Sequence, residues 1–261
     1  WRILLEDLEV AYNQARQNDN ICLHERSSDY VLWTKRLQCY TQDNAAEFAY
    51  WQNLSAIDVA LPCDYPEGSR NTCYYRKISI NLSQEQTQAL LKDAPAAYRT
   101  QVNDLLLSAL GRALCQWSGH EEILVDLEGH GREDLYSELD LSRTIGWFTT
   151  IFPVALDAPA EIGTGIKRIK ERLRHIPNRG IGYGLFKYYG TTEQRQILNR
   201  LPKAQVVFNY LGQFDGSFDE QGLWMLAQES AGDSMHGEVT QQHDLLLNSH
   251  IVNGEFCLEA G

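Results

Sequence analysis

The feature that most constrains the fold is an alternation of helical and strand-like segments after residue 70. Residues 101–117 are the clearest helix, because apolar side chains recur there at three- and four-residue spacing. We expect further helices at 83–91 and 161–175, and strands at 72–82, 122–128, 144–156 and 204–211, with a hairpin turning at Asn253-Gly254. Such alternation predicts an α+β fold in which helices pack on a sheet.

The first 60 residues follow a different pattern. Helices are predicted at 1–18, 27–40 and 43–54, with Asp43 as a candidate N-cap for the third. Turn-forming residues then cluster at 61–69, which makes this segment the best linker candidate. The chain opens inside an amphipathic pattern and closes inside a strand-like one, so we expect it to be cut at both ends and its first part to be an incomplete unit.

Composition excludes several classes of function. The net charge of −12 disfavours nucleic acid as a partner, because phosphate contacts need clustered lysine and arginine. Neither a signal peptide nor an apolar run of transmembrane length occurs, which predicts a cytoplasmic protein without a membrane partner. The six cysteines are scattered with no Cys-x-x-Cys pair, so we interpret them as free thiols.

The densest candidate for chemistry is the segment Asp126-Leu127-Glu128-Gly129-His130-Gly131-Arg132-Glu133, where five of eight residues are ionisable. A strand delivers it, and its two glycines predict an irregular turn. Crowded charge at a strand end suggests a function, because burying unpaired charge is costly. The alternative is a salt-bridged turn in which Arg132 neutralises Glu128 or Asp126 and His130 lies on the surface. The spacing of Glu128 and His130 matches no zinc motif, so no metal is expected.

Other segments give weaker signals. The glycines of 177–184 resemble a phosphate loop, but the Lys-Ser/Thr pair is missing and a helix precedes them, so nucleotide binding is not expected. The absence of a Gly-x-Ser-x-Gly motif argues against a standard hydrolase. In the strand at 206–211, alternation sends Asn209 and Tyr210 to opposite faces, so only one of them can face a given cavity directly.

Five segments, in order along the chain, together resemble the signature motifs of epimerization domains in nonribosomal peptide synthetases. They are 103–111 (NDLLLSALG), 128–133 (EGHGRE), 143–149 (RTIGWFT), 177–184 (PNRGIGYG) and 208–215 (FNYLGQFD). The second and fifth are more typical of epimerization domains than of condensation domains, which form peptide bonds. The chain is therefore identified as part of an epimerization domain in the condensation-domain superfamily.

This resemblance implies a fold like chloramphenicol acetyltransferase, a two-layer α/β sandwich in each of two related lobes with a tunnel between them. Residues 1–69 would be a remnant of the N-terminal lobe with the interlobe linker, and residues 70–261 the C-terminal lobe. The tunnel would admit the 4′-phosphopantetheine arm of a peptidyl carrier protein, which carries an aminoacyl or peptidyl thioester. The domain would act as an isomerase in antibiotic and other secondary-metabolite biosynthesis, beside adenylation and condensation domains, and would bind no cofactor of its own.

The resemblance also assigns roles to residues. Glu128 would be one acid/base for the Cα proton, with a pKa raised by burial. Arg132 would hold Glu128 or the loop in place. Tyr210 would relay a proton or stabilise the enolate, and Asn209 would position the reacting groups. His130 would be structural.

One family motif is absent. No His-His-x-x-x-Asp-Gly occurs, and none of the seven histidines lies in such a context. In the family this motif supplies the catalytic histidine and should precede a helix like that at 1–18. We therefore expect the chain alone to be inactive.

Two alternatives stay open: a condensation domain on the same scaffold, and a non-catalytic module that docks loaded carrier protein. The basic helix at 161–175 could dock an acidic carrier protein through Lys167 and Arg168, or could simply be a solvated face. Three more basic residues belong to it: Lys170, Arg172 and Arg174.

Overall fold

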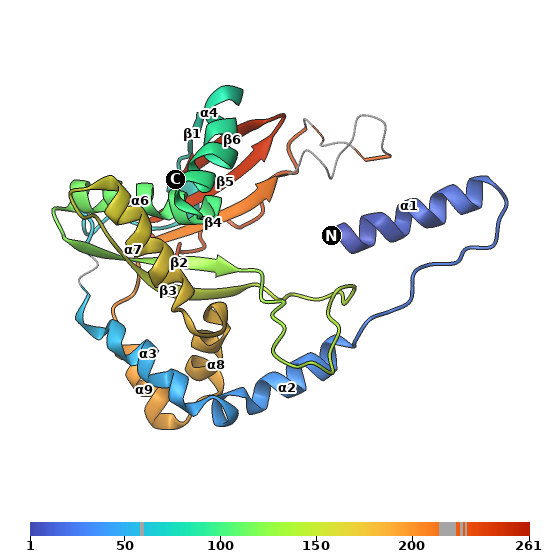
Figure 1. The fold of residues 1–261 in the computed structure, drawn as a ribbon, viewed down its shortest axis with the longest axis horizontal. Coiled ribbons are helices and arrows are strands. Elements are labelled where there is room, and N and C mark those ends of the chain that lie inside the picture. Colours follow the sequence, from blue (N-terminus) through green and yellow to red (C-terminus); the bar gives the residue numbers. More distant parts are fainter. Residues whose placement is uncertain (58–59, 214–222, 225–226, 228) are drawn as a thin grey trace.

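A computed structural model describes residues 1–57, 60–213, 223–224, 227 and 229–261 of the chain. Its centre is a six-stranded mixed sheet in the order β1-β6-β5-β4-β2-β3 (Figure 1). The strands are β1 (Ile78–Asn81), β2 (Glu122–Gly129), β3 (Thr150–Asp157), β4 (Val206–Gln213), β5 (Leu245–Val252) and β6 (Glu255–Ala260). This sheet, with helices packed on it, confirms the predicted α+β class.

The strand β2 joins two kinds of pairing. It runs antiparallel to β3 and parallel to β4, and β4 runs parallel to β5. Leu127 lies beside Phe152 of β3 and beside Phe208 of β4. Because the ends of β2 and β4 point the same way, Glu128 and Asn209 come to the same edge of the sheet.

The helix α6 (Val102–Ser118) and the helix α7 (Ile162–Arg174) pack over β2 and β3 (Figure 1). The apolar stripe of α6 buries Leu105, Leu107 and Leu114. Gly111 permits close approach to the sheet, since a Cβ there would lie 2.9 Å from the Cβ of Leu156. Beside them, toward β6, lie α4 (Gln84–Gln88), the π-helical turn η4 (Ala89–Asp93) and α5 (Ala94–Tyr98).

A second group of helices packs together on the other side of the molecule, below the sheet in Figure 1. These elements are α2 (Tyr30–Asp43), η1 (Ala45–Glu47), α3 (Phe48–Gln52), η2 (Asn53–Ala56), η5 (Pro177–Gly180), α8 (Ile181–Tyr189) and α9 (Thr192–Arg200). Trp33, Tyr40 and Trp51 belong to the same hydrophobic core as most of the buried residues of β2 and β3. Residues 30–51 therefore do not pack as a separate unit, while the division at residue 69 into remnants of two lobes stays a prediction.

A small network of hydrogen bonds joins α2 and α3 to the start of α8. The buried carboxyl group of Glu47 accepts from the Tyr40 hydroxyl at 2.5 Å, from Trp51 Nε1 at 2.9 Å and from Asn178 Nδ2 at 3.1 Å. Gly182 lies against it so closely that a Cβ there would be 2.6 Å from Glu47 Cδ. We call these five residues the Glu47 cluster. Burial and the neighbouring Glu47 raise the pKa of Tyr40, so its phenol stays protonated and donates.

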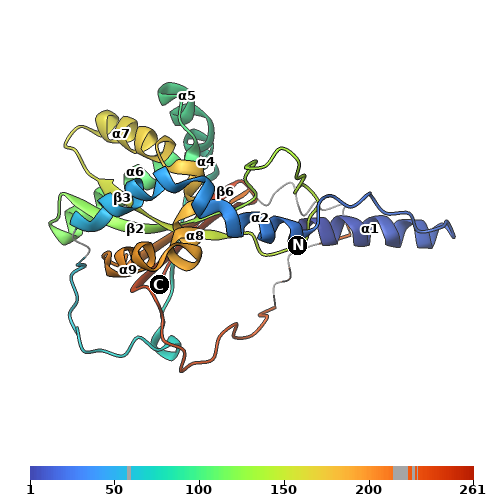
Figure 2. The ribbon, with the colours of Figure 1, turned by 90° about the horizontal axis from the view of Figure 1, so that it is seen from below.

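The first helix, α1 (Arg2–Arg16), buries none of its residues and extends away from the rest of the chain (Figures 1 and 2). Arg143 connects it to the loop between β2 and β3, donating to Glu6 at 2.8 Å and to Asp7 at 2.5 Å.

Several local predictions are confirmed. Ser83 forms a capping box with Gln86 at the start of α4, and the β5–β6 hairpin turns at Asn253 and Gly254, with φ of 53° and 72° as a type I′ turn requires. Asp43 as an N-cap is wrong, because it is the last residue of α2, which Asp29 caps.

The two predicted strands at 72–82 and 144–156 were drawn too long, since β1 begins at Ile78 after a short helical turn, η3 (Thr72–Tyr74), and β3 begins at Thr150. The helices α8 and α9 were not predicted.

Candidate active site

Glycines shape the bend that follows β2. Gly131 has φ of 66°, and a Cβ there would overlap the carbonyl oxygen of Phe148. Gly129 is packed almost as tightly, since its Cβ would lie 2.7 Å from Thr150 Oγ1. Glycine is therefore required at Gly131 and favoured at Gly129, and the chain bends after Gly129, the last residue of β2.

Glu128 lies at a small cavity of about 220 Å³. Asn103 at the start of α6, Leu127, Phe208 and Tyr210 line the cavity with it. Part of the Glu128 side chain is open to solvent, but its surroundings desolvate the carboxylate, and this burial raises the pKa of Glu128, while the nearby His243 opposes the rise. A carboxylate so placed can accept a proton more readily than an ordinary surface glutamate.

Asn209 and Tyr210 both lie next to Glu128, in different ways. Asn209 Nδ2 donates a hydrogen bond of 2.8 Å to Glu128 Oε2. Tyr210 lines the cavity, and burial raises its pKa, so its hydroxyl keeps its proton. The expectation that alternation allows only one of them to face the cavity agrees with this arrangement, in which Tyr210 lines the wall and Asn209 reaches Glu128 from the side. The last two residues of the 208–215 motif, Phe214 and Asp215, lie outside the described residues.

Arg132 holds the loop rather than Glu128. Its guanidinium donates to the Leu141 carbonyl oxygen at 2.6 Å and stacks over the Phe148 ring, 4.0 Å from the centroid. Desolvation in this position lowers the pKa of Arg132. The salt-bridged turn, with Arg132 neutralising Glu128 or Asp126, is therefore not what the structure shows. His130 is on the surface, as expected, with its Nε2 3.4 Å from the Glu133 carboxylate.

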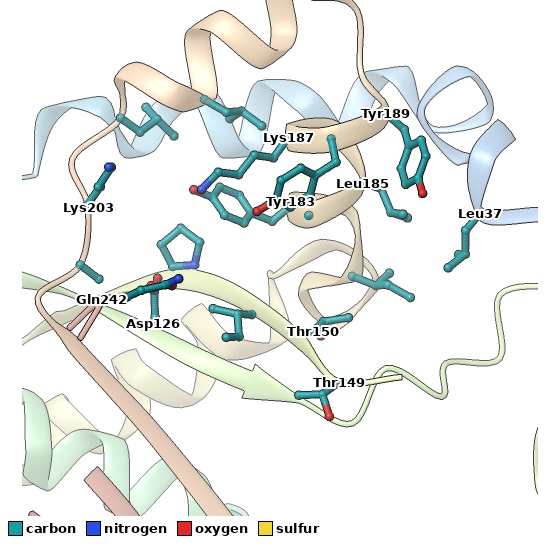
Figure 3. A pocket seen from close by; sticks show the side chains of 18 of the residues that line it. Leu37, Asp126, Thr149, Thr150, Tyr183, Leu185, Lys187, Tyr189, Lys203 and Gln242 are labelled. Carbon is teal, nitrogen blue, oxygen red and sulfur yellow. The ribbon is translucent and has the colours of Figure 1, made fainter. Parts of the chain in front are cut away.

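A second pair of ionisable groups lies close to Glu128 and was not predicted. His243 Nε2 and Asp126 Oδ2 are 2.8 Å apart. Both residues line a groove of about 730 Å³ between α8 and the sheet, with Tyr183, Lys187 and Lys203 (Figure 3). The sequence around His243 contains no motif. The pairing of His243 with Asp126 follows from the register of the strands. Leu245, two residues after His243, lies beside Val206 of β4, and Val206 lies beside Val125 of β2.

Most basic side chains of α7 already bond to acidic side chains or to a backbone carbonyl. Arg168 and Arg172 contact Asp157, Arg172 also pairs with Glu122 at 2.5 Å, and Lys170 donates to the Tyr98 carbonyl. This pairing favours a structural role for the basic face. Within the described part of the chain, no group of three His, Cys, Asp or Glu residues could hold a metal ion, and no helix is long and apolar enough to cross a membrane.

Comparison with known proteins shows the family to which the chain belongs. The family model of the condensation domain matches residues 1–260. The chain belongs to the condensation domain family. Among the relatives of this condensation-family chain are two of the proteins that make up linear gramicidin synthase in Brevibacillus parabrevis, to which it is 41% identical over 266 residues and 40% identical over 262 residues. These alignments cover 99% and 98% of the chain but only 3% and 5% of the two relatives.

A solved structure extends the comparison. The epimerization domain from the third module of tyrocidine synthetase B superposes with a TM-score of 0.90 and 36% identity, covering all of this chain and 59% of that one. The resemblance to nonribosomal peptide synthetase epimerization domains, predicted from motifs, is thus confirmed, as is the predicted fold class.

Proposed function

We propose that this condensation-family domain acts in epimerization, converting an L-aminoacyl or peptidyl residue to the D form while a carrier-protein phosphopantetheine holds it as a thioester. The observation that carries the proposal is that Glu128 and Tyr210 line one cavity while Asn209 Nδ2 donates to the Glu128 carboxylate at 2.8 Å. Amide-bond formation does not call for a carboxylate at this place, whereas moving a Cα proton does.

The chemistry follows from these groups. Glu128 takes the Cα proton, and the electron pair of the broken C–H bond moves into the thioester carbonyl as an enolate. Asn209 fixes the carboxylate by its hydrogen bond, and the Tyr210 hydroxyl, which stays protonated, can donate to the developing enolate oxygen. Return of a proton to the opposite face of Cα completes the inversion. The thioester itself delocalises the charge, so the proposal requires no resident cofactor.

A second acid is needed on the opposite face. The His-His-x-x-x-Asp-Gly motif, which would supply it in the family, is not among these 261 residues. We therefore propose that the chain alone does not epimerize its substrate, and that a module containing both motifs does. The carrier protein and neighbouring adenylation and condensation domains are the proposed partners.

The test is solvent-deuterium exchange at Cα of a loaded carrier protein, measured by mass spectrometry in a synthetase module that contains this chain. Glu128→Gln should reduce exchange by at least about 100-fold, as expected for loss of a general base. Glu121→Gln, an exposed glutamate just before β2, is the matched control and should exchange like the wild type. Exchange by Glu128→Gln at the wild-type rate would rule Glu128 out as an obligatory base.

The same assay separates epimerization from both alternatives, and the amide product and carrier-protein binding separate the two alternatives from each other. A condensation domain would form an amide product without exchanging the Cα proton, and a docking module would bind loaded carrier protein without doing either.

A further inference from the structure

Ser249 in β5 carries a hydroxyl group at a position that belongs to the core. Along this strand Leu247, Ser249 and Ile251 leave the same face of the sheet, and all three are buried, with Ser249 0% exposed. A buried hydroxyl group costs free energy unless it forms a hydrogen bond, whereas an apolar side chain at the same place does not. The role of this serine is therefore to be found in its hydrogen-bond partner.

The partner is the backbone of a candidate-site residue. Ser249 Oγ donates to the carbonyl oxygen of Asn209 at 3.2 Å. The side chain of Asn209 in turn donates from Nδ2 to Glu128 Oε2 at 2.8 Å. The three residues belong to β5, β4 and β2, which are neighbours in the sheet (Figure 1). Two hydrogen bonds, both through Asn209, therefore connect a fully buried hydroxyl group to the proposed base.

The pairing of β4 with β5 becomes irregular just after the two candidate residues of β4. The register is regular up to Tyr210, which lies beside Ser249, and the next pair is Gln213 with Ile251. The chain advances by three residues on β4 and by two on β5, so β4 carries one extra residue, a β-bulge. Gly212 in this bulge has φ of 83°. A bulge bends the strand and redirects its side chains, and bulges are frequent beside active sites.

Ser249 thus lies at the last regular pair before the bulge. Beyond this pair the regular ladder no longer holds β4, and the Ser249 hydroxyl group supplies a hydrogen bond to the Asn209 carbonyl at that point. A fixed carbonyl group fixes the peptide plane next to Cα, and with it the direction in which the Asn209 side chain leaves the strand. Small displacements matter here, because misplacing a reacting group by about 1 Å can cost on the order of 100-fold in rate.

We propose that Ser249 is a positioning residue, whose hydroxyl group holds the Asn209 carbonyl at the end of the regular β4–β5 pairing and so keeps the Asn209 amide directed at Glu128. The inference rests on the proposed function, because it concerns the orientation of the base in that reaction. Ser249 does not line the cavity beside Glu128, so it acts through Asn209 and not on the substrate.

The test replaces Ser249 with alanine in the synthetase module that contains this chain. The rate constant for deuterium exchange at Cα of the loaded carrier protein should fall about 10-fold, because the Asn209 amide is no longer held toward Glu128. The matched control is Thr87→Val. Thr87 is 1% exposed, and its hydroxyl group accepts from the backbone N–H of Phe256 at 2.9 Å, in β6. This control also removes a buried hydroxyl group, so it should lower Tm but exchange like the wild type.

A second pair of variants separates the hydroxyl group from the packing. Ser249→Thr and Ser249→Val add nearly the same volume to the buried site, but only threonine keeps a hydroxyl group. Ser249→Thr should therefore exchange about 10-fold faster than Ser249→Val, whatever the added volume costs in stability. Equal exchange rates in these two variants would overturn the inference, as would exchange at the wild-type rate by Ser249→Ala.

A double-mutant cycle tests the route through Asn209. In an Asn209→Ala background there is no amide to position, so Ser249→Ala should lower the exchange rate by about threefold at most, compared with about 10-fold in the native background. A purely structural role predicts the same factor in both backgrounds, and that result would also refute the inference.

The outcomes distinguish the inference from the proposed function. If Glu128→Gln abolishes exchange while Ser249→Ala exchanges like the wild type, the inference fails and the proposed function stands. If Glu128→Gln exchanges normally, the proposed function fails, and the positioning role of Ser249 fails with it.

Discussion

Replacing Gly182 with alanine tests the Glu47 cluster. In an ordinary helix this change stabilises by up to about 1 kcal/mol, because alanine has the higher helix propensity. Here the new Cβ would lie 2.6 Å from Glu47 Cδ, about 1 Å inside van der Waals contact. The side chain that must give way is buried and accepts three hydrogen bonds.

The magnitude follows from these competing terms. Overpacking a core costs about 1–3 kcal/mol, and displacing the carboxyl group breaks at least one buried hydrogen bond, which leaves a polar partner unsatisfied at a cost of about 1–3 kcal/mol. Subtracting the propensity gain leaves a net loss of about 3 kcal/mol. For a chain of this size that loss lowers Tm by roughly 6–12 °C.

The assay is thermal unfolding followed by tryptophan fluorescence, to which Trp51 in the cluster contributes. Gly184→Ala is the matched control, since it is in the same helix and a Cβ there would meet nothing within 4 Å. It should be neutral or slightly stabilising. In a Glu47→Ala background the clash is gone, so Gly182→Ala should cost nothing there. Equal stability of Gly182→Ala and Gly184→Ala in the native background would refute the reasoning.

Three further predictions concern other sites. Burial raises the pKa of Glu128 in the folded state, so the unfolded chain loses this proton first as pH rises above about 4.5, and the folded state loses stability there. Glu128→Gln should therefore be more stable than the wild type at neutral pH. In urea titrations this difference in stability should vanish at low pH. Arg132→Gln should cost about 1–3 kcal/mol in the same titrations, through loss of the Leu141 hydrogen bond and the stacking on Phe148, and no change would show that Arg132 does not anchor the loop. Arg168→Glu should destabilise, because it places a like charge at the buried Asp157, whereas exposed Lys167→Glu should not; weaker carrier-protein binding by Lys167→Glu would instead favour docking at α7.

Elements defined by local signals were predictable. The apolar stripe of α6, the Ser83 capping box and the Asn253-Gly254 turn each depend on residues close in the chain, and the structure contains all three. The start of α8 was not predictable in this way. Asn178 and Arg179 have φ of 42° and 52°, which non-glycine residues rarely adopt, and the hydrogen bonds from Asn178 to Tyr40 and Glu47 hold that turn. Three glycines within five positions then dilute the helical signal.

In the candidate site, too, the residues were predictable from local sequence, whereas their contacts depend on tertiary structure. Charge density and two glycines drew attention to Glu128, and the motif resemblance added Asn209 and Tyr210. That Asn209 contacts the carboxylate follows from the parallel pairing of β2 with β4, which no spacing in the sequence reveals. His243 is more than a hundred residues from Asp126 and lies in no motif, so only tertiary structure joins them.

The Glu47 cluster also decides where segments of such domains can be exchanged. Glu47 and its partners Asn178 and Gly182 are contributed by stretches separated by about half the chain. A chimera with its crossover anywhere between residues 52 and 177 would take the acceptor from one parent and the donor and the glycine from the other. Parents that differ at any of these three positions would yield hybrids in which Glu47 and its partners at the start of α8 do not match. Crossovers in domains of this kind should therefore keep the two stretches from the same parent.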